Sequence, residues 1–442
     1  MFYIVEEESK LVNLEKLIRL GGYVEVITSN DLYHPGLTTP VAVYIRLLKS
    51  DHGYIIPLDH DEGINVDKER IYSILSKASK LYTIDKKKLL YHFNLQDAID
   101  ISLLYSMVKF DKLEITKTNS ALNYFYNKFR GKPFVNKLVP ISKLYEASEN
   151  TYSLIEEILN YDIPEGFEFY NSTATNVFYL LEQHGIGIYY EPFVETFSPR
   201  DPLYNIKDNK VLTYYNLYNA TSRPTNSFNS VNFAAIPHTE KHRKTFRPQN
   251  DYFVEFDFDG YHLRLLAEQL DYSLTEESAH KQLAKLYFGK DKITDDEYTK
   301  AKQINFHAIY GKIPEEHKDL KIFKEIQEYI DNMWDMFNDE GFVCNPQSGK
   351  PFTKELKDMH PAKLMNYMMQ SLETSNNILI LKEVLRYLKD KQTKIALYTY
   401  DAILFDFSKE DGKDTLQDIQ KILEKDKQYP VKFKYSKSLV LE

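Results

Sequence analysis

The stretch YFVEFDFDGYHLRLLAEQL, residues 252–270, changes its hydrophobic period in the middle. Its first half alternates apolar and polar residues, as a half-buried strand does, and its second half has the three-to-four-residue spacing of a helix. Asp257 lies at the end of the predicted strand. A second stretch, KIALYTYDAILFDF at 394–407, predicts two apolar strands joined by a tight turn, with Asp401 at that turn.

Asp257 and Asp401 are candidate metal ligands because each lies at the end of a predicted apolar strand. An aspartate at a turn commonly accepts hydrogen bonds from backbone amides, which is a structural role. Two carboxylates at the ends of neighbouring strands could instead bind magnesium, which prefers oxygen ligands and retains bound phosphates. Two such ions about 4 Å apart would activate a hydroxyl and stabilise the leaving oxygen of a phosphoryl transfer. The sequence leaves open whether the two strands are neighbours.

Residues 300–312, KAKQINFHAIYGK, place Lys302, Phe306 and Tyr310 at intervals of four. On a helix these three side chains lie along one face. An ordinary half-buried helix, with Lys302 reaching to solvent and the rings in the core, explains such a stripe. The alternative is a helix that lies along a nucleotide, with the cation on the phosphates and the ring on the sugar and base.

The composition predicts a globular protein of two or three domains. The 442 residues are 43% hydrophobic and 27% charged. The single cysteine, Cys344, excludes an internal disulfide bond and is typical of a reducing compartment. The first residues lack the pattern of a signal peptide, and no apolar run is long enough to span a bilayer. We therefore expect a cytoplasmic protein without membrane contact.

The charge of the chain is unevenly distributed. A net charge of −9 argues against a protein that coats nucleic acid indiscriminately. Basic residues nevertheless gather at 109–143, interleaved with aromatic residues, and again at 238–249. Such runs are usually solvated surface, but two of them also make phosphate contact a hypothesis.

Six segments resemble the polymerase motifs of family A DNA polymerases, the DNA polymerase I-like enzymes, and they occur in that family's order. The resemblance covers residues 175–442. One such motif is weak evidence, whereas six in the right order make chance a poor explanation. The segments are the primer-side loop TSRPTNSFNSVNFAAIP, the first motif FDFDGYHLRLLAEQL, the segment SAHKQLAKLYFG before the fingers, the fingers helix KAKQINFHAIYG, the helix PAKLMNYMMQSLET and the third motif YTYDAILFDF.

This resemblance implies roles for individual residues. Asp257, Phe258 and Asp401 would hold two Mg²⁺ ions, for which Mn²⁺ is the expected substitute. Lys302 would grip the incoming triphosphate and is a candidate to protonate pyrophosphate, so the catalytic residues would be Asp257, Asp401 and Lys302. The incoming nucleotide would also contact His262, His280, Phe306 and Tyr310, and the primer–template DNA would contact Arg223, Asn366, Gln370 and Tyr310.

The resemblance also implies a multidomain protein of mixed α+β and α/β class, a right-hand polymerase preceded by a small α/β domain. Closure of its fingers on a correct base pair would be the gating step. The basic run at 109–143 would belong to the thumb. The expected division is an exonuclease-like domain at 1–105, the thumb and the start of the palm at 106–215, the palm with the first metal motif at 216–275, the fingers at 276–345 and the palm with the second metal motif at 346–442.

The chain departs from the family's motifs at several positions. The family's first motif carries a Glu, which excludes a ribose 2′-hydroxyl, where this chain has His262, so we expect DNA synthesis with looser ribonucleotide exclusion. The third motif usually reads His-Asp-Glu, whereas residues 400–402 read Tyr-Asp-Ala. The leading Arg of the second motif is replaced by Tyr298, with Lys300 as a partial substitute. Position 306 carries Phe and not Tyr, and this predicts discrimination against dideoxynucleotides.

Residues 1–105 resemble, more weakly, the 3′–5′ proofreading domain of the same family. GYIIPLDHDEG and the helix after it correspond to the middle of that domain. The strand YVEVITSN lacks the Asp-x-Glu pair that would hold metals, and LYTIDKKKLLYHF lacks the later Asp. We therefore expect a vestigial exonuclease fold without hydrolysis. The literal HDE at 60–62 is a decoy, because it precedes the first motif.

The leading hypothesis is a compact, phage-type DNA polymerase without proofreading. It would act as a monomer in the host cytoplasm on primer–template DNA and deoxynucleoside triphosphates, with replication accessory proteins as further partners. One alternative is a single-subunit RNA polymerase, which shares the palm and fingers. His262, in place of the Glu, leaves this alternative open. A catalytically inactive DNA-binding subunit is the other, and the joint presence of Asp257, Lys302, Tyr310 and Asp401 argues against it.

Overall fold

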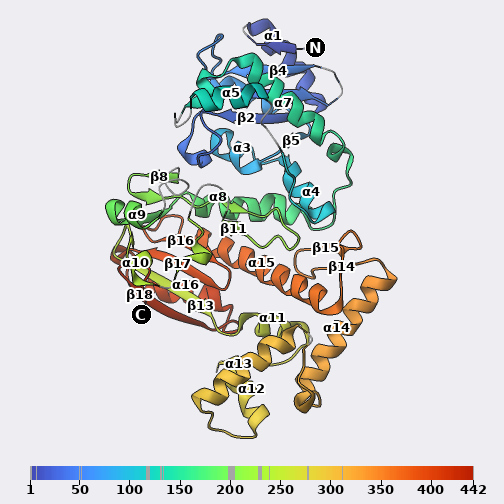
Figure 1. Cartoon of the computed structure of the whole chain (residues 1–442), viewed down its shortest axis with the longest axis vertical. Coiled ribbons are helices and arrows are strands. Elements are labelled where there is room, and N and C mark those ends of the chain that lie inside the picture. The colour runs from blue at the N-terminus through green and yellow to red at the C-terminus, as the bar shows by residue number, and fades with distance from the viewer. Residues whose placement is uncertain are drawn as a thin grey trace. The chain divides into compact units, whose positions relative to one another are not determined.

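The computed structural model of the chain divides into two compact units (Figure 1). Unit 1 comprises Met1–Gln183, Ser198–Tyr214 and Asn226–Val231, and unit 2 comprises His184–Phe197, Tyr215–Thr225 and Asn232–Glu442. The structure describes residues 2–5, 7–48, 50, 52–115, 120–129, 132, 134–197, 205–226, 231–237, 239–275, 278–310 and 312–441. Lys117, Arg130 and His238 of the basic runs, and residues 227–230 of the primer-side loop, lie outside these ranges.

None of the helices in the described ranges combines the length and the apolar character that crossing a bilayer requires.

Unit 1 is built on a mixed six-stranded sheet in the order β1-β4-β3-β2-β5-β6. Its strands β4, β3 and β2 are antiparallel neighbours, and the expected strand at YVEVITSN is confirmed as β2. The outer strands run parallel to their neighbours. The strands are β1 (Phe2–Ile4), β2 (Gly22–Thr28), β3 (Pro40–Leu47), β4 (Gly53–Pro57), β5 (Leu81–Thr83) and β6 (Ala98–Asp100).

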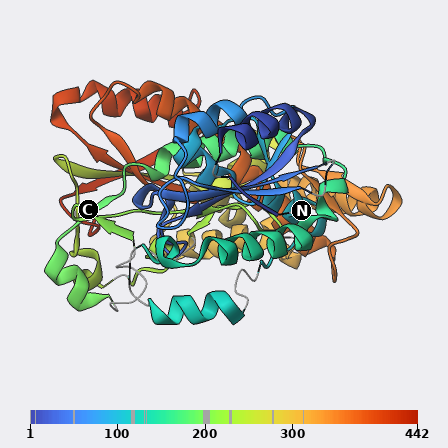
Figure 2. The same ribbon diagram turned by 90° about the horizontal axis from the view of Figure 1, so that it is seen from above.

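Helices cover both faces of this sheet (Figure 2). Side chains alternate between the two faces of a strand. Val43 and Ile45 of β3 therefore join the apolar core under α1 (Glu8–Leu17), α2 (Lys68–Leu75) and α3 (Lys86–Phe93). The intervening Tyr44 donates a hydrogen bond to Glu149 of α7 (Ile141–Ile155) on the other face, at 2.5 Å.

The HDE sequence at 60–62 has a structural role. Nε2 of the buried His60 lies 2.9 Å from the carbonyl oxygen of Val139, and a carboxylate oxygen of Glu62 accepts a hydrogen bond from the backbone amide of Ile141 at 2.9 Å. This carboxylate therefore satisfies an amide in the first turn of α7, where helical amides have no partner within the helix.

Unit 2 contains a four-stranded antiparallel sheet in the order β16-β17-β13-β18. The predicted strand–turn–strand unit is confirmed as β16 and β17, and the predicted strand before Gly260 is confirmed as β13. The register places Asp257 opposite Ala402, so the two strands that carry Asp257 and Asp401 are neighbours. The strands are β13 (Tyr252–Phe258), β16 (Lys394–Thr399), β17 (Ala402–Phe407) and β18 (Val431–Ser436).

Helices surround this sheet and extend away from it (Figure 1). The helices predicted after Gly260, over KAKQINFHAIYG and over PAKLMNYMMQSLET are confirmed as α11, α13 and α15. α13 begins at a capping box, in which Oγ1 of Thr294 accepts from the amide of Glu297 and the Glu297 carboxylate accepts from the amide of Thr294. The helices are α11 (Tyr261–Gln269), α12 (Ala279–Phe288), α13 (Asp295–Ile309), α14 (Lys321–Asp339), α15 (Pro361–Tyr387) and α16 (Asp414–Glu424).

The remaining elements are short or connect these parts. They are α4 (Ile101–Lys109), α5 (Ser120–Lys128), α6 (Val135–Leu138), α8 (Thr175–Glu182), α9 (Tyr190–Thr196), α10 (Glu240–Arg243), β7 (Ile186–Ile188), β8 (Ile206–Lys207), β9 (Lys210–Val211), β10 (Tyr215–Asn216), β11 (Thr225–Asn226), β12 (Phe246–Arg247), β14 (Phe342–Cys344), β15 (Pro351–Thr353), the 3₁₀ helices η1 (Ile18–Leu20), η2 (Pro35–Leu37), η3 (Ile158–Asn160), η6 (Phe233–Ala235), η7 (Glu315–His317) and η8 (Lys409–Asp411), and the π-helix η4 (Phe169–Ala174).

Candidate active site

A cavity of about 700 Å³ in unit 2 collects the predicted site residues. Its walls come from the end of β13, from α11, α12, α13 and α15, and from the turn between β16 and β17. The predicted residues that line it are Arg223, Asp257, Phe258, His262, His280, Lys302, Phe306, Tyr310, Asn366, Gln370 and Asp401. Lys300, the expected partial substitute for the second motif's Arg, is not among the lining residues, whereas Tyr298 is.

Asp257 and Asp401 lie together at the mouth of this pocket. The amide of Phe258 donates to the carbonyl oxygen of Asp401 at 3.0 Å, which ties the end of β13 to the turn before β17. Burial and the charge of Asp401 raise the pKa of Asp257, and burial and the charge of Glu373 raise the pKa of Asp401. Neither carboxylate forms an ion pair with another described residue. The ionised form of both carboxylates is therefore unfavourable in the absence of a bound cation.

This donor set fits a divalent cation that shares its coordination with a substrate. Within the described residues no group of three or more His, Cys, Asp or Glu side chains is placed to hold a metal ion. Mg²⁺, however, is usually bound by one or two carboxylates, water and substrate phosphates, and it does not need a cage of protein ligands. The pair Asp257 and Asp401 meets that requirement, and Phe258, the next residue of β13, lines the same pocket.

Asp259, the other aspartate of FDFDG, has a structural role. One of its carboxylate oxygens accepts from the amide of Ala279 at the start of α12 at 3.1 Å, and the other forms an ion pair with Lys432 of β18. Burial raises the pKa of Asp259, but the hydrogen bonds and charge of Lys432 outweigh it, so this pKa lies below its usual range. Asp259 therefore anchors α12 and Lys432 beside the pocket.

The α13 stripe faces the pocket and not the core. Phe306 is 61% exposed, and Lys302 is exposed as well, although both line the cavity. The rings of Phe306 and Tyr310 meet edge to face, with centroids 5.5 Å apart. An apolar ring that served only as core would be buried, so the position of Phe306 favours the nucleotide-binding alternative for this helix.

Buried Asn305, between these residues, orients His280. The Tyr287 hydroxyl donates to Oδ1 of Asn305, and Nδ2 of Asn305 then donates to Nδ1 of His280 at 2.9 Å. The proton of the neutral imidazole therefore lies on Nε2, close to Gly260 at the pocket wall. Burial lowers the pKa of His280, with Lys302 adding to the effect, so the ring is a neutral donor at pH 7.

Glu373 of α15 is the pocket residue that the sequence reasoning missed. Its carboxylate lies 2.9 Å from the guanidinium of Arg223 and 3.3 Å from Nε2 of His262. Nδ1 of His262 in turn lies 3.2 Å from the Tyr310 hydroxyl. The available signal was helical spacing, because Asn366, Gln370 and Glu373 follow one another at intervals of four and three on one face of the helix.

Arg223, Asn366 and Gln370 are joined through short polar contacts at the same end of the pocket. Nε2 of Gln370 donates to Oδ1 of Asn366 at 3.0 Å, and the Thr221 hydroxyl donates to Oε1 of Gln370 at 3.2 Å. The guanidinium of Arg223 stacks over the ring of Tyr400, 3.7 Å from its centroid. These contacts fix the two amide groups on α15 and hold the guanidinium of Arg223 over Tyr400, the residue before Asp401.

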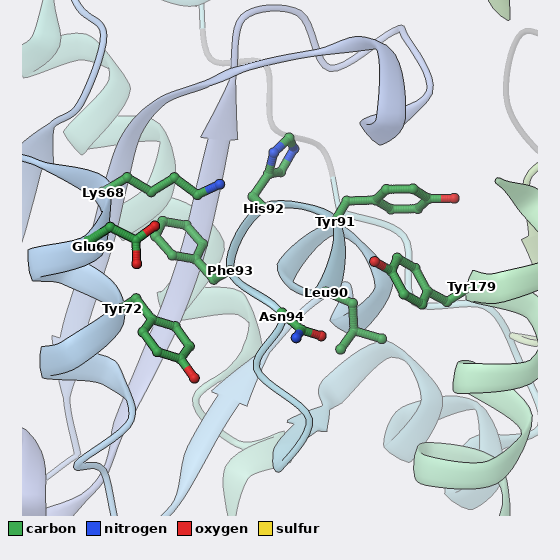
Figure 3. A pocket seen from close by; sticks show the side chains of 9 residues that line it. All are labelled: Lys68, Glu69, Tyr72, Leu90, Tyr91, His92, Phe93, Asn94 and Tyr179. Carbon is green, nitrogen blue, oxygen red and sulfur yellow. The ribbon is translucent and has the colours of Figure 1, made fainter.

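A second cavity, of about 450 Å³, lies in unit 1 (Figure 3). Figure 3 shows Lys68 and Glu69 on one side and the rings of Tyr91 and Tyr179 on the other, and these rings meet edge to face with centroids 4.8 Å apart. Burial lowers the pKa of His92 to about 3, so this ring is neutral. Glu69 is the only carboxylate among the described residues that line this cavity, which therefore offers no acidic pair.

No protein-family model matches the sequence, and no curated protein matches it. The fold is similar to that of a solved structure described as the POL domain of Pol1 from M. smegmatis in complex with DNA primer-template and dNTP. The similarity covers 100% of this chain and 99% of that chain, with a TM-score of 0.71 and 14% sequence identity. At this identity the similarity concerns the fold, and the chain therefore has the fold of a DNA polymerase domain.

Proposed function

We propose that the chain is a template-directed DNA polymerase of the DNA polymerase I-like type, which adds deoxynucleotides to a primer 3′ end. The observation that carries the proposal is the pair Asp257 and Asp401, which shares one pocket with Lys302. The fold similarity to a structure that holds DNA primer-template and dNTP supports it. In this proposal the sheet of unit 2 is the palm and α12–α14 are the fingers.

Asp257, Asp401 and the carbonyl of Phe258 would hold Mg²⁺, with Mn²⁺ as substitute. A divalent ion bound there supplies Lewis-acid chemistry, lowering the pKa of the attacking hydroxyl and neutralising charge on the phosphates. The raised pKa values of the two aspartates are the physical reason why a cation is favoured at this point.

The pocket's charges orient the nucleotide. Lys302, Lys432 and the Nε2–H of His280 provide donors for phosphate oxygens at one end. At the other end Glu373 pairs with Arg223, so this end offers no unpaired cation to a phosphate. The triphosphate therefore lies toward Lys302, where the ammonium can donate a proton to the leaving pyrophosphate, and the sugar lies toward Phe306 and Tyr310.

Arg223, Asn366 and Gln370 would bind the primer–template pair. Every correct base pair presents acceptors at similar positions in the minor groove, so donors fixed at those positions check pair geometry without preferring a sequence. The mutual hydrogen bonding of Asn366 and Gln370 would keep these donors in place before DNA arrives.

Primer extension tests the proposal. A labelled primer on a DNA template is incubated with Mg²⁺ and deoxynucleotides, using wild type, Asp401→Asn and the exposed control Asp390→Asn. We expect extension by wild type and by the control and a loss on the order of 10³-fold in Asp401→Asn, because one of the two charges of the metal pair is removed. Extension by Asp401→Asn at the wild-type rate would contradict the assignment of the site.

A further inference from the structure

Four side chains form a continuous line across one wall of the pocket. Tyr310 contacts His262, His262 contacts Glu373, and Glu373 contacts Arg223. They come from the end of α13, from α11, from α15 and from the loop before β11. Glu373 is the innermost member, with 1% of its surface exposed. A carboxylate this deeply buried needs its cationic and hydrogen-bonding neighbours to stay in place.

Glu373 does not reach a ligand directly. Its Oε2 and Nε2 of His262 are both sealed from a water-sized group, and neither has a well-aligned hydrogen bond within the described residues. A hydroxyl of a bound molecule would therefore meet the exposed edges of His262 and Tyr310 and not the carboxylate. Any effect of Glu373 on a ligand has to pass through the imidazole that it holds.

The spacing of residues along α13 indicates that the sugar of a bound nucleotide lies beside these four side chains. Lys302 and Tyr310 are eight residues apart, which is about 12 Å on a helix at 1.5 Å per residue. Phosphates bound at Lys302 therefore leave the sugar of a nucleoside triphosphate near Phe306 and Tyr310. His262 is the polar group that contacts Tyr310 at that point.

We propose that Glu373 sets the sugar selectivity of the pocket by positioning His262 against Tyr310. The charge of the carboxylate lies 3.3 Å from Nε2 and attracts that side of the ring, and Nδ1 is thereby kept at the Tyr310 hydroxyl. In the His262–Tyr310 contact, Nδ1 and the phenol hydroxyl engage each other and are not offered to a 2′-hydroxyl, so deoxynucleotides are preferred over ribonucleotides. This inference rests on the proposed polymerase function. It adds Glu373 as the residue that positions His262 beside the 2′ carbon of the substrate.

The test compares single-nucleotide incorporation of a deoxy- and a ribonucleoside triphosphate with the same base. The proteins are wild type, Glu373→Ala, the isosteric Glu373→Gln and the matched control Glu383→Gln, an exposed carboxylate on the same helix. We expect Glu373→Ala to lower the ratio of deoxy to ribo kcat/KM by at least tenfold, mainly through a lower KM for the ribonucleotide. The ratio for Glu373→Gln should lie between those of wild type and Glu373→Ala, because the side-chain carbonyl of Gln retains an acceptor. The ratio for Glu383→Gln should equal that of wild type.

A purely structural role for Glu373 predicts equal losses for both nucleotides and an unchanged ratio, and that result would overturn the inference. A wild-type enzyme that does not distinguish the two sugars would overturn it as well. Should Glu373→Ala fail to fold, Glu373→Gln alone still decides between these outcomes.

A double-mutant comparison tests the positioning role separately. His262→Ala should lower the ratio by itself, and adding Glu373→Ala to it should have no further effect, because the two residues act as one unit. Additive effects would contradict the positioning role. An inactive wild type would instead refute the proposed function, so the two failures are distinguishable.

Discussion

The pKa values of Asp257 and Asp401 lie above their usual range, with burial as the leading cause for both. A carboxyl whose pKa is raised by folding binds its proton more tightly in the folded state than in the unfolded state, so stability falls as pH rises through that pKa. At neutral pH the ionised pair therefore destabilises the metal-free protein, and a bound cation relieves this cost.

Replacing Asp401 by Asn should consequently raise the melting temperature of the metal-free protein at pH 7. The same change should reduce the further rise that Mn²⁺ or Mg²⁺ produces in wild type, because one of the two carboxylates is gone. Thermal unfolding with EDTA and with added metal measures both effects, and Asp390→Asn is the control. A wild-type melting temperature that no divalent ion raises would count against a metal site here.

Lys350 gives a second prediction at the level of one residue. It is fully buried, its ammonium contacts the Ser222 hydroxyl, and burial lowers its pKa to about 7. Between pH 7 and the ordinary value of 10.5 the unfolded state holds one proton more than the folded state. Stability should therefore rise with pH across this window, by about 1.4 kcal/mol per pH unit from this group.

Urea unfolding of wild type and Lys350→Met at several values between pH 7 and 9 tests that slope. In the variant the contribution of this group is absent, so the two slopes should differ by about 1 kcal/mol per unit or more. Because Ser222 precedes Arg223, the variant should also bind primer–template DNA more weakly. Parallel pH dependences of the two proteins would show that Lys350 stays charged when buried.

At the level of elements, the pair α12 and α13 is held at its centre by the chain from Tyr287 through Asn305 to His280. Replacing Tyr287 by Phe removes one hydroxyl and should lower the free energy of unfolding by about 1 kcal/mol. It should also raise the KM for deoxynucleotides several-fold, because the orientation of the Asn305 amide and thus the tautomer of His280 are no longer fixed. Steady-state kinetics and urea unfolding measure the two effects.

The matched control is Tyr329→Phe, a half-buried tyrosine on α14 that does not line the pocket. It should leave the KM unchanged. Equal KM values for Tyr287→Phe and wild type would show that His280 does not need this chain for its function.

The same elements show what the sequence could and could not predict. The strands β13, β16 and β17 and the helices α13 and α15 follow directly from hydrophobic period and turn position, and they were predicted correctly. That Asp257 and Asp401 are neighbours could not be read from local pattern, because strand pairing is a long-range contact. Glu373 was missed since a carboxylate in a long helix looks like solvated surface until Arg223 and His262 are placed beside it. In the structure this carboxylate lies 3.3 Å from the imidazole of His262.

At the level of the whole molecule, unit 1 bears on whether the protein can proofread. On its sheet, the buried Glu25 receives a contact from the Tyr23 hydroxyl at 3.5 Å. The nearby Asp31 forms an ion pair with Lys88 at 2.5 Å and also contacts Asn136. A carboxylate that a lysine already neutralises is a poor ligand for a second cation.

We therefore predict that the purified protein does not remove a mispaired 3′ nucleotide. A 3′-labelled mismatched primer–template incubated with Mg²⁺ and no nucleotides provides the measurement, with Asp31→Ala as a companion variant. Both proteins should leave the label in place. If wild type released the label and Asp31→Ala did not, unit 1 would contain an active exonuclease.

The central claim, templated DNA synthesis in the pocket of unit 2, is tested most directly by single-nucleotide addition on four templates. The templates differ only in the first unpaired base, and each is offered the four deoxynucleotides one at a time with Mg²⁺. We predict that each template is extended efficiently by its complementary nucleotide alone. Addition that ignores the template base, or the absence of addition by wild type on every template, would contradict it.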